Sequence, residues 1–162
     1  MIQRIQSVFL LIAALVMISV LFLTIWTKVD INKQEIVTIN AYQLTYESFT
    51  EDGAKTLIMA KDTFYISILA VLASAIALFS VFQYKNRLRQ IQLGALNSLL
   101  MGGTLGLSYY FSTKGEALID NGQQGIFQEG FYIIALALLM NSMANRYIRR
   151  DEKLVRSADR IR

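Results

Sequence analysis

Few residues in this chain could bind a ligand or catalyse a reaction. The first candidate for a ligand site is the glycine-rich stretch GALNSLLMGGTLG, at residues 94–106. A glycine loop can cradle phosphate with its backbone amides, but that chemistry needs a lysine and a hydroxyl directly after the loop, as in GxxxxGK[ST]. No GK[ST] sequence occurs in the chain. Small residues stand instead at every fourth position, at Gly94, Ser98, Gly102 and Gly106. This pattern lets transmembrane helices approach closely, so we predict a packing surface and no phosphate site.

The side chains most used in catalysis and metal binding are missing. The chain contains no histidine and no cysteine, which removes imidazole bases, thiol nucleophiles, disulfides and nearly every zinc, copper or haem site. A serine nucleophile would lack a base, because no lysine lies within an apolar run. The acids Glu129 and Asp62 leave a lipid-metabolising enzyme as the last-ranked alternative. We expect no catalytic residues, no metal and no cofactor.

Four long apolar runs set the fold class. Hydrophobic residues make up 54% of the 162 and charged residues 17%, and the mean hydropathy is +0.41, too apolar for an ordinary soluble domain. Each run has about 19 residues, enough as a helix to cross the hydrocarbon of a bilayer. The runs cover residues 8–26, 64–82, 93–111 and 127–145. We predict an all-α membrane protein, a single domain formed by a bundle of four transmembrane helices.

The distribution of lysine and arginine predicts the orientation, because basic residues concentrate on the cytoplasmic side of a membrane. One lies before the first run, three lie between the second and third, and seven follow the fourth, which makes eleven against five in the other two connections. We therefore expect both termini and a loop at 83–92 in the cytoplasm, with outer loops at 27–63 and 112–126. Orientation and anionic lipid explain a basic inner face, so we expect no nucleic-acid partner.

The longer outer loop predicts strands. Its sequence IVTINAYQLTYESF is rich in β-branched and aromatic residues, which favour strands over helices. We predict a hairpin that pairs 28–31 with 34–39, or a small three-stranded sheet that adds 42–49, between the first and second helices. Residues 51–53 then form a turn, and Lys61 and Asp62 cap the second helix.

Two asparagines are expected to pair inside the bundle. Asn97 lies four residues after the start of the third run, and Asn141 lies four before the end of the fourth, beside Ala137. Since the two helices run antiparallel, both amides lie at about the same depth, where they could bond to each other and fix the register of the helices. Nearby carbonyls or headgroup water are the alternative partners. The adjacent Gly102 and Gly103 could also break the third helix, as in some transporters.

The end of the chain predicts a basic amphipathic helix that continues the fourth span over 146–162. Its apolar residues repeat at offsets of three and four, and basic residues fill much of the remainder. The helix either lies on the inner leaflet or docks a partner. The residues expected to contact lipid or a partner are Arg146, Arg149, Arg150, Lys153, Arg156 and Arg160.

The two ends of the chain resemble a known family. The opening MIQRIQSVFLLIA, residues 1–13, and the closing NRYIRRDEKLVRSADRIR, residues 145–162, are similar to those of small four-helix membrane proteins from Bacteroidota, listed as a domain of unknown function. The resemblance covers the whole chain. It implies the inner membrane of a Gram-negative bacterium, with the outer loops in the periplasm, and it supplies no activity or site residues.

Elimination and packing together indicate the function. We expect a non-catalytic integral inner-membrane protein, an accessory or scaffold subunit that contacts lipid and membrane-protein partners, or a second copy of itself, through its periplasmic loop and basic tail. The alternative is a small transporter or channel component that acts as an oligomer, which the glycine pair in the third helix suggests.

Overall fold

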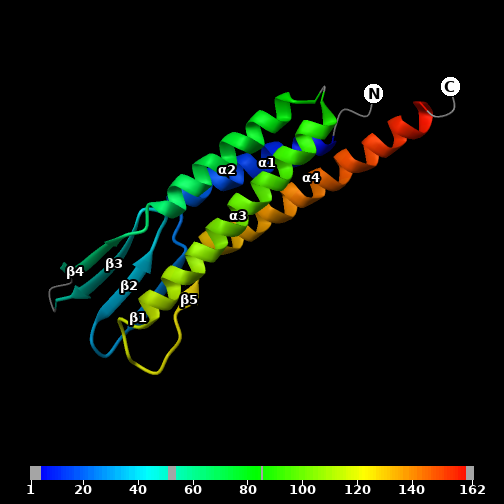
Figure 1. Ribbon diagram of the computed structural model, residues 1–162. Coiled ribbons are helices and arrows are strands. Elements are labelled where there is room, and N and C mark those ends of the chain that lie inside the picture. The colour runs from blue at the N-terminus through cyan, green and yellow to red at the C-terminus, as the bar shows by residue number, and fades with distance from the viewer. Residues whose placement is uncertain (1–4, 51–53, 85, 160–162) are drawn as a thin grey trace.

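The computed structural model describes residues 5–50, 54–84 and 86–159, and it shows a mixed fold of helices and a sheet. Helices α1 (Ile5–Ser19), α2 (Tyr65–Phe82), α3 (Arg87–Glu116) and α4 (Glu129–Asp159) lie side by side, and the sheet lies beyond one end of them (Figure 1). We call this the sheet end. The other end, towards which both termini run, is the terminal end.

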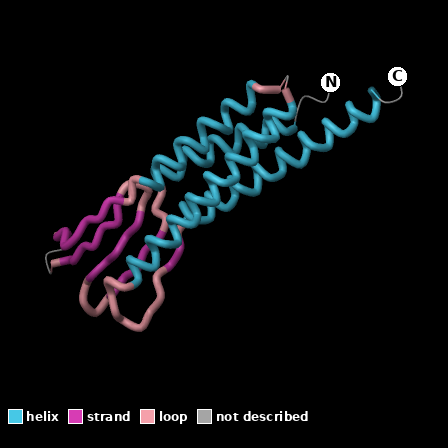
Figure 2. The backbone as a smooth tube through the Cα atoms, viewed as in Figure 1, coloured by secondary structure: helices cyan, strands magenta, loops and turns pink. Residues whose placement is uncertain are grey.

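Five antiparallel strands form the sheet, in the order β4-β3-β2-β1-β5. Figure 2 shows all of them gathered at the sheet end. The strands are β1 (Trp26–Asp30), β2 (Glu35–Ile39), β3 (Gln43–Phe49), β4 (Lys55–Asp62) and β5 (Ile126–Phe127). The prediction of an all-α protein with a small hairpin or three-stranded sheet between the first two helices is therefore wrong. The sheet is larger, and its fifth strand comes from the connection between α3 and α4.

The two missed strands explain the error. The two residues predicted to cap the second helix, Lys61 and Asp62, belong to β4, while α2 begins after Phe64 without a side-chain cap. Every residue of β4 is exposed, so the strand lacks the alternation of apolar and polar residues that marks a half-buried strand. β5 has only two residues, and one of them was counted in the fourth apolar run. The predicted turn at 51–53 lies outside the described residues.

The sheet is joined to the helices by one continuous core. The Trp26 ring, 2% exposed, packs against Gly115 of α3 and against Gly125 before β5, where a Cβ would overlap it. Val37 and Ile39 of β2 belong to the same apolar cluster as Met101 of α3. The last turns of α3 also run alongside β1 and β2. Sheet and helices therefore form one body.

An ion pair with a buried lysine and a half-buried carboxylate fixes the same joint. Lys28 of β1 is 5% exposed, and its Nζ donates to Glu116 Oε1 at the end of α3 over 2.6 Å. The backbone amide of Gly125 donates to the other carboxylate oxygen of Glu116 over 3.0 Å. Burial raises the pKa of Glu116, but the hydrogen bonds from Lys28 and Gly125 outweigh it and leave the pKa below its ordinary value. This ionised carboxylate ties β1, α3 and the connection to β5 together.

Three helices are long and apolar enough to cross a membrane. They cover Ile5–Phe22, Tyr65–Phe82 and Glu129–Val155, with mean hydropathies of 2.6, 2.4 and 1.2. The first consists of α1 and a short 3₁₀ turn, Val20–Phe22. α3 is not among them, because glycines, asparagine and hydroxyl residues lower its hydropathy. Many of its polar side chains are turned inward, including Asn97, Thr104 and Ser108.

α3 runs unbroken for 30 residues. The alternative of a helix broken at Gly102 and Gly103 is therefore ruled out. Neither residue has a positive φ angle, and an α-helix tolerates single glycines at a modest cost in stability.

Candidate functional site

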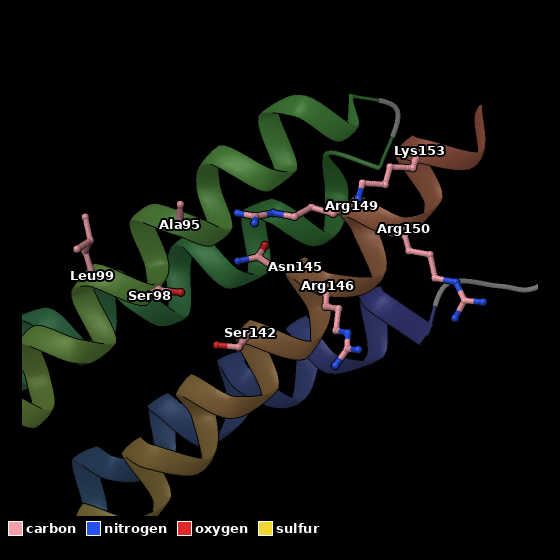
Figure 3. A pocket seen from close by; sticks show the side chains of 9 residues that line it. All are labelled: Ala95, Ser98, Leu99, Ser142, Asn145, Arg146, Arg149, Arg150 and Lys153. Carbon is pink, nitrogen blue, oxygen red and sulfur yellow. The ribbon is translucent and has the colours of Figure 1, made fainter. Parts of the chain in front are cut away.

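A groove lies between α3 and α4 near the terminal end, and small, apolar and amide side chains line it together with several cations. We call it the basic groove (Figure 3). Its volume is about 1030 Å³. Ala95, Ser98 and Leu99 line it from α3, and Ser142 and Asn145 from α4. Leu99 is 74% exposed, so this part of the groove is open towards whatever surrounds the helices.

Four cations of α4 complete the lining: Arg146, Arg149, Arg150 and Lys153. Each is exposed, and Arg149 reaches from α4 towards α3 across the groove (Figure 3). The ion pairs Lys28–Glu116 and Lys55–Glu47 both lie at the sheet end, away from the cations of the groove. Asp151 and Glu152 lie on the same helix but do not line the groove. The groove therefore presents concentrated positive charge beside an apolar surface.

Asn145 lies between the two helices at the centre of the groove (Figure 3). Its side chain is 9% exposed, and its Oδ1 is buried without a hydrogen-bond partner. The amide packs directly on Gly94 of α3, where any Cβ would overlap it. The glycine thus makes room for the amide, and the amide carries an acceptor that nothing in the described chain satisfies. An unpaired buried acceptor costs about 1–3 kcal/mol, and this oxygen lies against Gly94.

One turn deeper, the predicted pair of asparagines is confirmed. Asn97 Nδ2 donates to Asn141 Oδ1 over 3.3 Å, and both residues are fully buried. Asn141 Nδ2 in turn donates to the Gly94 carbonyl over 2.8 Å and to Ser98 Oγ over 2.9 Å. Ala137 is buried beside this network on α4. The network sets the register of α3 against α4 directly behind the groove.

The predicted four-residue stripe holds at its first two members and fails at the others. Gly94 is buried and Ser98 is half-buried in the contact with α4. Gly102 and Gly106 are exposed, and a Cβ on either would meet no atom within 4 Å. A helix turns about 100° per residue, so a spacing of four drifts by about 40° per step. By Gly106 the stripe has left the face that packs.

The face of α3 that does pack follows mixed spacings of three and four, with Gln90, Gly94, Asn97, Met101, Thr104 and Ser108 on it. Sequence reasoning missed Gln90, which is fully buried and donates from Nε2 to the Ser80 carbonyl over 2.9 Å. Its position seven residues before Asn97 was the available signal. The side chain of Arg156 is not described, and Arg160 lies outside the described residues, so these two predicted contact residues remain unplaced.

Comparison with known proteins identifies a family and no activity. No curated protein and no solved structure matches the chain. A family model described as "Domain of unknown function (DUF4293)" matches residues 2–161, nearly the whole chain. The protein therefore belongs to the DUF4293 family.

Proposed function

We propose that this protein is a non-catalytic integral membrane scaffold whose terminal end faces the cytoplasm and binds acidic lipid headgroups in the basic groove. The observation that carries the proposal is the groove itself, where four cations of α4 lie beside Ala95 and the exposed Leu99 of α3. Cations next to apolar surface suit a lipid, because its phosphate lies at the interface and its chains lie in the hydrocarbon. Basic pockets between helices on the cytoplasmic side bind such headgroups in other proteins.

The proposal includes α3 as a fourth span. The buried face of α3 carries its amides and hydroxyls, and the hydroxyls of Thr104 and Ser108 each donate to a carbonyl one turn earlier in α3, over 2.8 Å. Polar side chains inside a membrane bundle are satisfied in this way by neighbouring backbone and helices. The outward residues Leu96 and Leu99 and the pair Tyr109 and Tyr110 are exposed. An outward face of this kind suits lipid although the average hydropathy of α3 is lower.

A second surface of the scaffold is the free edge of β4. All eight of its residues are exposed, including Leu57, Ile58 and Met59, and an edge strand can pair with an extended segment of another chain. A bulge at Ile58 and lysines at 55 and 61 protect this edge against indiscriminate pairing. A photo-crosslinking residue in place of Leu57 should give one discrete adduct in membranes. The same ladder of products from a control at Thr50 would argue against a partner.

The transporter or channel alternative loses the observation that suggested it, because α3 is continuous through Gly102 and Gly103.

Lipid titration tests the proposal. The full chain in a neutral detergent is titrated with dioleoyl phosphatidylglycerol, and bound lipid is counted by native mass spectrometry. Each interfacial cation contributes about 1 kcal/mol, so Arg146→Gln with Arg149→Gln should weaken binding by on the order of tenfold or more. Lys114→Gln, at the sheet end of α3, is the matched control and should bind like the wild type. Equal affinity in all three proteins would refute the proposal.

A further inference from the structure

Resting on the second surface of the proposed function, the free edge of β4, we infer that its partner is another membrane protein. This partner packs a transmembrane helix against α2 and adds the extended segment that follows this helix to β4. The segment runs away from the membrane, with a basic residue near the span and an acidic residue six positions later. The direction of β4, its outward-facing backbone groups and its charges lead to this assignment.

The direction of β4 fixes the direction of a strand added to it. β3 and β4 lie in line with α2 (Figure 1), and β4 ends at Asp62, just before α2 begins at Tyr65. β4 therefore runs towards the helices. Because the sheet is antiparallel throughout, a strand added to β4 runs outward, as β1 does after α1. A transmembrane helix joined directly to that strand precedes it in the partner's sequence.

The same direction excludes β4 of a second copy. Two copies of one strand that pair antiparallel are related by a twofold axis perpendicular to the strands. Since the strands follow the helices (Figure 1), this axis would point the two helical bundles in opposite directions. Both copies could not then span one membrane in the same orientation. The added strand therefore belongs to a different segment.

The ladder with β3 shows which backbone groups of β4 face outward. At one end of the ladder the amide of Thr63 donates to the Tyr42 carbonyl over 2.8 Å, and at the other end the amide of Thr50 donates to the Ala54 carbonyl over 2.9 Å. Inward and outward bonding alternate along an antiparallel strand, and the register shift at the bulge displaces this alternation by one residue. The residues whose backbone groups face outward are Lys55, Leu57, Ala60 and Asp62.

These four residues share one face of the sheet and carry opposite charges at its two ends. They pair with alternate residues of β3, from Gln43 to Phe49. Asp62 lies at the membrane end and Lys55 at the outer end, where its ion pair with Glu47 is 3.6 Å long and leaves it 62% exposed. Opposite charges on directly paired residues stabilise antiparallel strands. A complementary strand therefore has a basic residue beside Asp62 and an acidic residue beside Lys55, six positions later, the interval from Gln43 to Phe49.

α2 continues the line of β4 and offers the second contact. Exposed residues of α2 recur at spacings of three and four, which makes an outward stripe of Ile68, Leu72, Ala75, Phe79 and Phe82. An added strand of eight residues or fewer is marginally stable by itself. A helix packed on this stripe and joined to the strand raises the effective concentration of each contact for the other.

Photo-crosslinking from two positions tests the inference. A crosslinking residue replaces Leu57 in one variant of the full chain and Leu72 in another, and the adducts formed in native membranes are mapped by peptide sequencing. We expect the same protein at both positions, with Leu57 joined to the segment directly after its transmembrane helix. Leu139 of α4, also exposed, is the matched control and should not capture this protein. A soluble protein or a second copy of this chain at Leu57 would overturn the inference.

Two substitutions at the edge test the pairing itself. Ala60→Pro removes an outward N–H and leaves the bonds to β3 in place, so the chain should unfold near the wild-type temperature. The yield of the Leu57 adduct should fall roughly two- to twelvefold, the effect of one hydrogen bond. Ala60→Val keeps the N–H and should keep the yield. Asp62→Lys leaves the backbone unchanged and should lower the yield roughly twofold or more. An undiminished adduct in both Ala60→Pro and Asp62→Lys would overturn the inference.

The outcomes separate this inference from the proposed function. The absence of a discrete adduct at Leu57 would remove the partner surface of the scaffold itself. A discrete adduct at Leu57 from a protein that Leu72 does not capture would overturn only the assignment of a membrane-spanning partner. Lipid binding by the basic groove is measured on the purified chain, so neither result affects it.

Discussion

The two ends of the molecule treat buried polar groups in opposite ways. At the sheet end, buried Lys28 contacts Glu116, and buried Asp30 accepts from the backbone amides of Asn32 and Lys33 over 2.9 and 3.3 Å. Towards the terminal end, the described residues include six buried polar atoms without partners. They belong to Gln6, Ser80, Arg87, Gln90, Asn97 and Asn145. The buried polar atoms of the described residues at the sheet end therefore have partners, whereas these six do not.

Packing follows the same division. The large apolar cluster connects the sheet to the middle of the helices, from Trp26 through Ile134 to Met17. Near the terminal end, a separate small cluster contains Leu10, Ala144 and Ile148. Since native structures rarely leave buried polar groups unpaired, an end that has several of them is where water or a ligand belongs. The comparison is the reason for proposing binding at the terminal end and rigidity at the sheet end.

Filling the space behind the groove should have the largest effect. Gly94→Leu drives a side chain into the Asn145 amide, and overpacking of this kind costs about 2–3 kcal/mol of unfolding free energy. Gly102→Leu is the matched control, because a Cβ there meets nothing, and it should cost less than about 1 kcal/mol. Thermal unfolding in detergent measures both. Equal losses would restore the four-residue stripe as the packing face.

Removing the ion pair at the sheet end should have the next largest effect. Lys28→Met leaves Glu116 with one donor instead of two, and we expect a loss of about 1–2 kcal/mol, limited by the 37% exposure of the Glu116 side chain. Lys55→Met breaks an ion pair of 3.6 Å whose lysine is 62% exposed, so it should cost less than about 0.5 kcal/mol. A larger loss for Lys55→Met would contradict the picture of a tightly joined sheet end.

The same pair predicts a pH dependence. The pKa of Glu116 is lower in the folded protein than its ordinary value, so its contribution is fully present above the unfolded pKa, about 4.3, and is lost as the pH falls through the folded pKa. Glu116→Gln should therefore be less stable than the wild type at pH 7 and should lose less stability on acidification to pH 3. Parallel pH profiles would show that the carboxylate does not contribute.

The smallest effect is expected from the paired amides. Asn97→Leu and Asn141→Leu should each cost about 0.6–2 kcal/mol, and the double variant should cost less than the sum, because both changes remove the same hydrogen bond. Additive losses in the cycle would show that each amide acts through other partners, such as Gly94 and Ser98.

The sequence predicted the structure correctly where a residue type has one common structural role. β1, β2 and β3 were close to prediction because their β-branched and aromatic residues favour strands. Asn97 and Asn141 were paired correctly, because an amide in an apolar helix needs a partner at its own depth. α4 continues to Asp159 as the helix formers after Asn145 indicate.

The remainder depends on tertiary placement. β4 is stabilised by its register with β3, and its own residues carry no alternation to reveal it. Gly94 and Gly106 look equivalent along the chain, yet the rotation of the helix buries one and exposes the other. The groove requires Ala95 of α3 and Arg149 of α4 to meet across the bundle, a contact between positions 54 residues apart that no local pattern encodes.

The proposed function requires the two ends of the molecule to lie on opposite sides of one membrane, and single-cysteine labelling tests this most directly. The chain has no cysteine of its own, so Thr50→Cys, next to the sheet edge, and Ser157→Cys, near the end of α4, each provide one reporter at an exposed position. With a membrane-impermeant thiol reagent on intact spheroplasts, we predict labelling of Thr50→Cys and none of Ser157→Cys until the cells are lysed. Labelling of Ser157→Cys in intact cells would place the basic groove outside and contradict the account.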